Sequence, residues 1–176
     1  MDTFTIPNNI YLLGMPGSGK STLGRALSEE LGIAFYDLDQ YIETQAGKDI
    51  TRIFAEDGED GFRSIENQCL IQLSEQSHPK VIATGGGTPC FNKNIEYIDF
   101  HGVGIFLNVP LEIIVERLIQ QGTGGRPLLQ DKSPKELLGQ LHDHFLQRKA
   151  YYLKAFIHME GSSISMKDIM EELKAL

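Results

Sequence analysis

The sequence predicts a three-layer α/β/α fold, in which helices cover both faces of a mostly parallel sheet. Short apolar runs alternate with longer amphipathic stretches along the chain, which is the pattern of strands alternating with helices. The apolar runs are rich in β-branched and aromatic residues and are bounded by glycine, proline or asparagine, as buried strands are. A length of 176 residues fits one domain with a sizeable core, so we treat residues 1–176 as a single domain.

The individual elements follow from the same pattern. We expect strands at 10–13, 34–38, 81–84 and 103–109, with 156–159 as a candidate fifth strand. Amphipathic stretches predict helices at 20–31, 59–76, 111–120, 134–154 and 166–176. The fourth helix has a good start signal, because Ser133 can cap it and Pro134 suits its first position. Ligands in such folds bind at the carboxyl ends of the strands, so we expect the chemistry in the segments that follow them.

Composition narrows the classes of partner. The net charge is −8 and the pI about 5.1, which argues against broad binding to nucleic acids or to anionic membranes. Cys69 and Cys90 are isolated and are expected to be reduced thiols. The first residues show no basic segment followed by an apolar one, and no run approaches 18 apolar residues. We therefore expect a soluble, cytoplasmic protein.

The loop after the first predicted strand reads GMPGSGKST at residues 14–22. It matches the phosphate-binding pattern G-x-x-x-x-G-K-[ST] in full, between a predicted strand and a predicted helix. Its glycines let backbone N–H groups turn toward phosphate oxygens, and the helix N-terminus adds a favourable dipole. Lys20 would reach the β- and γ-phosphates, and Ser21 would ligate Mg²⁺. The alternative is a glycine-rich turn with an accidental lysine. We expect the nucleotide to be held by Gly17, Ser18, Gly19, Lys20, Ser21 and Thr22.

Two other nucleotide-binding patterns are not supported. A dinucleotide fingerprint would need a glycine where Thr22 stands. A guanine-reading segment would need an aspartate at the end of 92–95, which reads NKNI and is expected to start a surface helix. ATP is therefore favoured over GTP.

Two carboxylates mark the end of the second predicted strand. Asp37 and Asp39 are two residues apart, so on an extended chain they point to the same side. Beside a triphosphate they would suit Mg²⁺ with its water shell and the acceptance of a hydroxyl proton. The alternative is that Asp39 only caps the next helix and that Asp37 is solvated.

Two further groups are suggestive without being specific. Arg63 and Glu66 are three residues apart on a predicted helix, so they share a face and can pair, although such a pair is most often a surface interaction. The third predicted strand runs straight into Gly85, Gly86 and Gly87. These glycines would let a ligand lie against bare backbone, and the alternative is a flexible turn.

Together these motifs resemble those of the shikimate kinase family. The segments GMPGSGKST, FYDLDQYIE, IFAEDGEDGFRSIE, VIATGGG, GRPLL and a late R-x-x-x-Y occur in this order over nearly the whole chain. The phosphate loop alone is shared by very many proteins, whereas the combination is highly specific. The resemblance implies a five-stranded parallel sheet of the nucleoside-monophosphate-kinase type, with a substrate-binding helical region at about 37–66 and a lid at about 120–132.

The resemblance also implies roles for the matching residues. Asp39 would contact the shikimate hydroxyls and accept the reacting proton, while Asp37 would lie at the water shell of Mg²⁺. Arg126 in GRPLL would be the lid arginine that closes over the phosphates and, with Lys20, would assist catalysis. The carboxylate and ring of shikimate would be bound by Arg63, Arg148, Gly85, Gly86 and Gly87.

Some residues depart from the family pattern or receive no role. The usual proline after Arg148 is missing, although the spacing to Tyr152 is kept. Arg117 is the nearest candidate for the arginine that usually lies near the adenine. His142 and His144 look like metal ligands, but residues two apart on a helix face away from each other, so a solvated helix face is expected.

The expected function is ATP-dependent, Mg²⁺-assisted phosphorylation of the shikimate 3-hydroxyl in chorismate and aromatic amino-acid biosynthesis, by a monomer. One alternative is another small-molecule kinase of similar fold, such as a gluconate-type enzyme. Others are a nucleotide switch and a catalytically silent relative that serves as a binding module. The silent relative is disfavoured because the chain keeps Lys20, Asp39, Arg63, Arg126 and Arg148.

Overall fold

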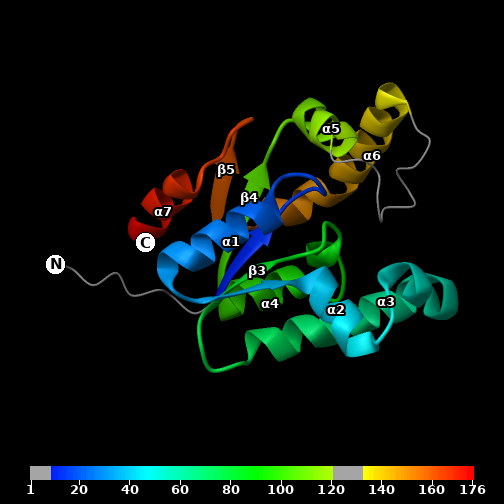
Figure 1. Ribbon diagram of the computed structural model, residues 1–176, viewed down its shortest axis with the longest axis horizontal. Helices are drawn as coiled ribbons and strands as arrows, with labels where there is room; N and C mark the ends of the chain where they lie inside the picture. The colour runs from blue at the N-terminus through cyan, green and yellow to red at the C-terminus, as the bar shows by residue number, and fades with distance from the viewer. Residues whose placement is uncertain (1–8, 121–132) are drawn as a thin grey trace.

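Five parallel strands form one sheet in the order β2-β3-β1-β4-β5 (Figure 1). This computed structural model describes residues 9–120 and 133–176 of the chain. The strands are β1 (Asn9–Leu13), β2 (Ala34–Asp37), β3 (Lys80–Ala83), β4 (Gly102–Asn108) and β5 (Ile157–Glu160). All five strands that the sequence predicted are present, and the parallel α/β architecture is confirmed.

Helices connect the strands and cover the sheet. They are α1 (Lys20–Leu31), α2 (Leu38–Ala46), α3 (Ile50–Ser74), α4 (Asn94–His101), α5 (Leu111–Gln120), α6 (Pro134–Tyr152) and α7 (Met166–Lys174), with a short 3-10 helix η1 at Thr88–Cys90. Ser133 caps α6 as predicted, and its hydroxyl accepts a hydrogen bond from the backbone N–H of Glu136. Within the described residues, no helix combines the length and the apolar character needed to cross a membrane.

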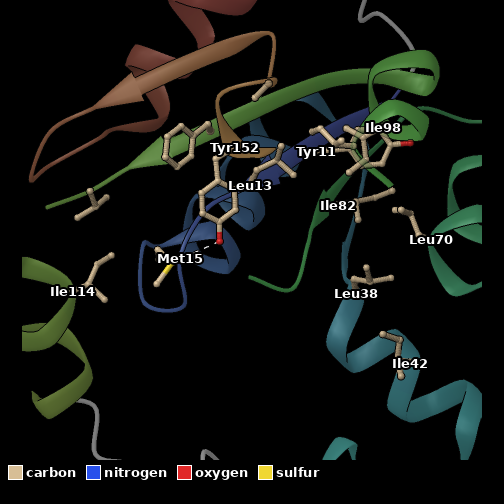
Figure 2. Close-up of a cluster of buried hydrophobic side chains, with 14 of the residues drawn as sticks. Tyr11, Leu13, Met15, Leu38, Ile42, Leu70, Ile82, Ile98, Ile114 and Tyr152 are labelled. Atoms are coloured by element: carbon tan, nitrogen blue, oxygen red, sulfur yellow. Dashed lines mark hydrogen bonds between the residues drawn. The ribbon is translucent and has the colours of Figure 1, made fainter. Parts of the chain in front are cut away.

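The side chains of β1 alternate between two hydrophobic clusters, one on each face of the sheet. Ile10 and Leu12 pack with residues of α1 and α7 on one face. Tyr11 and Leu13 belong to the cluster on the other face, which includes residues of α2 through α6, and Figure 2 shows part of that cluster. Because both faces are covered, all five residues of β1 are buried, which explains its uninterrupted apolar run.

The helices beside β2 and β3 differ from those predicted. Helix α2 begins immediately after β2, and α3 begins at Ile50 rather than at 59. The periodicity was hard to read because Gly58 interrupts α3 with φ 70° and ψ −174°, so the apolar stripe changes phase there. Asp49 marks the true start, since its side chain accepts a hydrogen bond from the backbone N–H of Arg52.

The prediction that Asp37 and Asp39 lie on one extended strand is wrong. Asp37 ends β2 and caps α2, with its carboxylate accepting hydrogen bonds from the backbone N–H groups of Asp39 and Gln40. Asp39 therefore lies in the first turn of a helix. The alternative, in which Asp39 caps the helix and Asp37 is solvated, is also wrong, because the cap is Asp37. Asp37 is both the last residue of β2 and the N-cap of α2. The spacing of the two aspartates alone does not show whether the second one lies on the strand or on the helix.

Gly102 provides a test of how closely β1 and β4 approach. It starts β4 opposite Asn9, and a β-carbon built on it would overlap the carbonyl oxygen of Asn9 and lie 2.7 Å from its carbonyl carbon. We expect Gly102→Ala to lower the free energy of unfolding by about 3 kcal/mol, because backbone rather than a flexible side chain would have to move. Urea denaturation followed by circular dichroism measures this.

Gly139 is the matched control. It lies exposed on α6, and a β-carbon there would meet no atom within 4 Å. Gly139→Ala should raise the free energy of unfolding by about 0.5–1 kcal/mol, because alanine is the better helix former. Equal stabilities of the Gly102 variant and the unaltered protein would contradict the packing described here.

Candidate active site

A cavity of about 700 Å³ opens at the carboxyl edge of the sheet. The loops after β1, β2 and β3 meet there, as the parallel topology requires. Part of α6 forms another wall. The lining side chains and backbone come from Pro16–Leu23, Asp37, Asp39, Thr84–Gly86, Val109, Arg117, Gln140, Leu141, His144, Arg148 and Ile164. The cavity therefore brings together most of the described residues that the sequence analysis singled out.

The phosphate loop joins β1 to α1 and curves around the amino group of Lys20. Gly19 precedes the helix with φ 100°, a left-handed conformation that favours glycine. A β-carbon on Gly14 would lie 2.9 Å from the carbonyl oxygen of Leu107 on β4. Lys20 Nζ donates to the carbonyl oxygens of Gly14 and Met15, each at 2.9 Å, and the side chain is largely buried. A rigid loop with a lysine beneath it and a helix N-terminus behind it is suited to bind phosphates.

Ser21 and Asp37 form an oxygen-rich pair next to this loop. The hydroxyl of Ser21, in the first turn of α1, donates to Asp37 Oδ2 at 2.6 Å. Hydroxyl and carboxylate oxygens are the ligands and water-shell partners that Mg²⁺ prefers, and magnesium usually keeps several waters and binds through few protein groups. The residues present thus fit a magnesium ion beside the bound phosphates.

Three successive glycines after β3 bring three charged side chains close to one stretch of backbone. A β-carbon on Gly85 would lie 3.0 Å from Asp39 Oδ1. On Gly86 it would lie 3.1 Å from Arg148 Nη1, and on Gly87 it would lie 2.7 Å from Arg63 Nη2. A β-carbon on Gly87 would force the Arg63 guanidinium to shift, and on Gly85 and Gly86 it would make unusually tight contacts. The glycines therefore favour close approach, and Asp39, Arg148 and Arg63 converge around residues 85–87.

Arg63 occupies a different compartment from the other two. Its Nη1 donates to Glu66 Oε2 at 2.8 Å, and Glu66, which is 1% exposed, also accepts a 2.6 Å hydrogen bond from the Thr88 hydroxyl. Asp39 and Arg148 line the 700 Å³ cavity, whereas Arg63 lines a neighbouring hollow of about 280 Å³ with Phe91. The Arg63 guanidinium thus lies beside Gly87 without lining the larger cavity.

The environment of Asp39 raises the pKa of its carboxyl group. Burial is the largest effect, and the nearby charges of Asp37 and Glu66 act in the same direction, while Lys20 opposes them. Together they raise the pKa of Asp39 to about 6. A carboxylate with this pKa is ionised at neutral pH, yet it binds a proton more readily than an ordinary aspartate does. It is suited to accept a proton from a hydroxyl group.

Several other residues reach the site that the sequence analysis left without a role. His144 and Gln140 lie one and two helical turns before Arg148 and line the cavity with it. Their spacing of four and eight residues from Arg148 was the available signal. Tyr152 is fully buried, and its hydroxyl donates to the carbonyl oxygen of Gly86 at 2.5 Å. Figure 2 shows Tyr152 beside Met15 of the phosphate loop.

Of the two arginines that the sequence analysis placed near the nucleotide, the structure describes only Arg117. Arg117, on α5, lines the cavity and donates to the carbonyl oxygens of Ser18 at 3.3 Å and Ser162 at 2.8 Å. It is thus held at the phosphate loop, where contact with the adenine stays a prediction. Arg126 and nearly all of the predicted lid at 120–132 lie outside the described residues.

Comparisons of the sequence and of the structure with known proteins all point to the same family. A family model described as shikimate kinase matches residues 16–176. A shikimate kinase of Azobacteroides pseudotrichonymphae is 39% identical over 164 residues, which cover 93% of this chain and 96% of that protein.

Solved structures agree with this result. A shikimate kinase from Bacteroides thetaiotaomicron superposes with a TM-score of 0.86 at 34% identity and covers 96% of this chain and 95% of its own. The shikimate kinase from Acinetobacter baumannii in complex with shikimate has a TM-score of 0.80 at 35% identity, covering 97% of this chain and 92% of its own.

The raised pKa of Asp39 predicts a cost in stability. An unfolded aspartate ionises near pH 3.9, whereas the folded one keeps its proton up to about pH 6. Between these values the native state binds more protons, so its stability falls as the pH rises. An asparagine side chain at this position would carry no such cost. We expect Asp39→Asn to raise the free energy of unfolding by about 1–3 kcal/mol at pH 7.5.

The pH dependence distinguishes this effect from a change in packing. The advantage of Asp39→Asn should be complete above about pH 6 and fade as the pH falls toward 4, because both chains are then neutral at this position. Urea denaturation at pH 4, 5, 6 and 7.5 measures it, with Asp99→Asn on the exposed surface of α4 as the control. A difference that does not change with pH would contradict the assignment.

Proposed function

The chain belongs to the shikimate kinase family, and we propose that it transfers the γ-phosphoryl group of ATP to the 3-hydroxyl of shikimate, giving shikimate 3-phosphate and ADP. The observation that carries this proposal is the convergence of Asp39, Arg148 and Arg63 on three glycines beside a phosphate-binding loop. A proton acceptor and two guanidinium groups at one stretch of bare backbone fit an acceptor that carries both a hydroxyl and a carboxylate.

The two arginines would bind the substrate carboxylate. Guanidinium groups present forked donors that match two carboxylate oxygens, and two arginines reaching one loop from α3 and α6 would fix the orientation of the ring. The backbone of residues 85–87 would lie against the ring. This local concentration of cations explains how a chain of net charge −8 can bind an anionic substrate.

Asp39 would then act on the hydroxyl. As the hydroxyl oxygen forms its bond to the γ-phosphorus, the bond from that phosphorus to the β-phosphate oxygen breaks and ADP leaves. The hydroxyl proton passes to Asp39. A pKa of about 6 keeps this group ionised before the reaction and raises its affinity for the proton during it. Phosphoryl transfer otherwise needs mainly positioning and charge neutralisation.

Charge on the phosphates would be neutralised by Lys20, by Arg126 and by magnesium. Ser21 and Asp37 would hold Mg²⁺, directly or through its waters, and the ion would supply positive charge to the phosphate oxygens when bound. Arg117 would lie near the adenine. All of these groups come from one chain, so we propose that a monomer is sufficient for activity.

Substitutions at the substrate end should separate turnover from nucleotide binding. We expect Arg63→Ala and Asp39→Asn each to lower kcat/KM for shikimate by about 10²–10⁴-fold, through loss of a charge-assisted contact and of the proton acceptor respectively. Affinity for ATP, measured by calorimetry, should stay nearly unchanged. Shikimate-dependent ADP release in a coupled assay gives the rate.

Arg52 supplies the matched control for Arg63. It lies on the same helix with its side chain 65% exposed and pairs with Glu56 at the surface. Arg52→Ala should keep normal activity. Parallel assays with shikimate, quinate and gluconate test the gluconate-type alternative. Equal loss of ATP affinity in the Arg63 and Asp39 variants, or faster turnover of gluconate, would count against the proposal.

The pH–rate profile tests the role of Asp39. We expect kcat/KM for shikimate to fall as the pH drops through about 6, because protonated Asp39 can no longer accept the hydroxyl proton. Asp37→Asn should move the midpoint of this fall to lower pH, since the charge of Asp37 helps to raise the pKa of Asp39. The midpoint is the relevant quantity, because the same change would also reduce the plateau rate. A midpoint unmoved by Asp37→Asn would contradict this coupling.

A further inference from the structure

The guanidinium group of Arg63 lies close to two aromatic rings. Its central carbon is 4.0 Å from the centre of the Phe91 ring and 5.0 Å from that of Phe62. Phe62 precedes Arg63 on α3 and is buried in the core, so its position follows from the helix. Phe91 comes from a separate segment, directly after η1, and it is the closer of the two rings.

The backbone around Phe91 is strained in a way that fixes this contact. Asn92 and Lys93 follow it with φ of 50° and 58°, the only left-handed residues other than glycine in 9–120 and 133–176. Asparagine adopts this conformation more readily than most residues, whereas for lysine it is uncommon and persists where the surroundings enforce it. The amide of Asn92 donates to the carbonyl oxygen of Arg63 at 2.9 Å. The turn at 91–93 is thus tied to the same residue that the Phe91 ring covers.

Stacking orients a guanidinium without using its hydrogen-bond donors. All of its N–H groups lie in the plane of the group, while the aromatic ring contacts its face. Nη1 of Arg63 is paired with Glu66, and Nη2 reaches Glu59 at 3.4 Å. Nε is buried and has no hydrogen-bond partner among the residues that the structure describes. Donor capacity therefore remains for a carboxylate, while Phe91 limits rotation of the plane.

We propose that Phe91 is a positioning residue for the acceptor substrate, which sets the plane of the Arg63 guanidinium so that it can bind the substrate carboxylate. The inference rests on the proposed function of Arg63. Phe91 itself need not touch the substrate. It acts through Arg63, and its effect should therefore appear in the binding of the carboxylate rather than in the chemical step.

Phe91→Leu tests this role with little disturbance of the core, since Phe91 is already 37% exposed. The expected result is a KM for shikimate raised about five- to tenfold, with kcat within about twofold and KM for ATP unchanged, as for lost uniform binding. Phe91→Trp should restore KM to within about twofold, because tryptophan offers the strongest cation–π surface. The natural chain has no tryptophan, so fluorescence from the introduced indole should also change when shikimate is added.

A double-mutant cycle shows whether Phe91 acts through Arg63. Shikimate binding is measured by calorimetry for the unaltered protein, Phe91→Leu, Arg63→Lys and the double variant. Lysine keeps the charge but has no plane to orient, so Phe91→Leu should weaken binding by less than about twofold in that background. Phe100→Leu, at a side chain 82% exposed on α4, is the control and should behave like the unaltered protein.

Results that differ from these would overturn either the role of Phe91 or the proposed function. An unchanged KM in Phe91→Leu, an equal rise in KM for shikimate and ATP, no restoration by Phe91→Trp, or the same loss in both backgrounds would overturn the role of Phe91. If the unaltered protein releases no ADP in response to shikimate, the proposed function fails. If it does, and Phe91→Leu matches it, only the present inference fails.

Discussion

The site depends on the absence of side chains at residues 85–87. Three glycines in succession let Asp39, Arg148 and Arg63 approach one stretch of backbone from α2, α6 and α3, at distances of 2.7–3.1 Å from where a β-carbon would stand. The parallel topology brings this stretch beside the phosphate loop, because β1 and β3 are neighbours and both end at the same edge. Close approach and strand order together place a proton acceptor and two cations within one compact region.

Two carboxyl groups in this region, those of Glu66 and Asp39, differ in how well neighbouring groups compensate their burial. Glu66 is almost fully buried, but it accepts hydrogen bonds from Arg63 and from the Thr88 hydroxyl, so its burial is compensated. Asp39 receives only partial relief from Lys20, which is outweighed by burial and by the charges of Asp37 and Glu66. Glu66 thus has a structural role as a hydrogen-bond acceptor, while Asp39 is left with a pKa suited to proton transfer.

The parts predicted from the sequence were those that a local pattern encodes. Five strands and the phosphate loop follow from apolar runs and glycine spacing, and the pairing of Arg63 with Glu66 follows from helical spacing. Helix α2 was missed because its cap, Asp37, is also the last residue of a strand. The start of α3 was hidden by Gly58, and the stacking of Phe91 on Arg63 depends on a turn with two left-handed residues that no periodicity reveals.

Several unfavourable features of the described chain lie around this same edge. The pKa of Asp39 is raised, and the backbone of Asn92 and Lys93 is in the left-handed conformation. The buried Nε of Arg63 has no hydrogen-bond partner among the residues described. Each is of a kind that costs stability, whereas both faces of the sheet are packed with apolar side chains. A ligand with a carboxylate and a hydroxyl would satisfy the free donor of Arg63 and hydrogen-bond to Asp39. Binding free energy would then offset strain that is already present in the folded chain, so the site is prepared for such a ligand before it arrives.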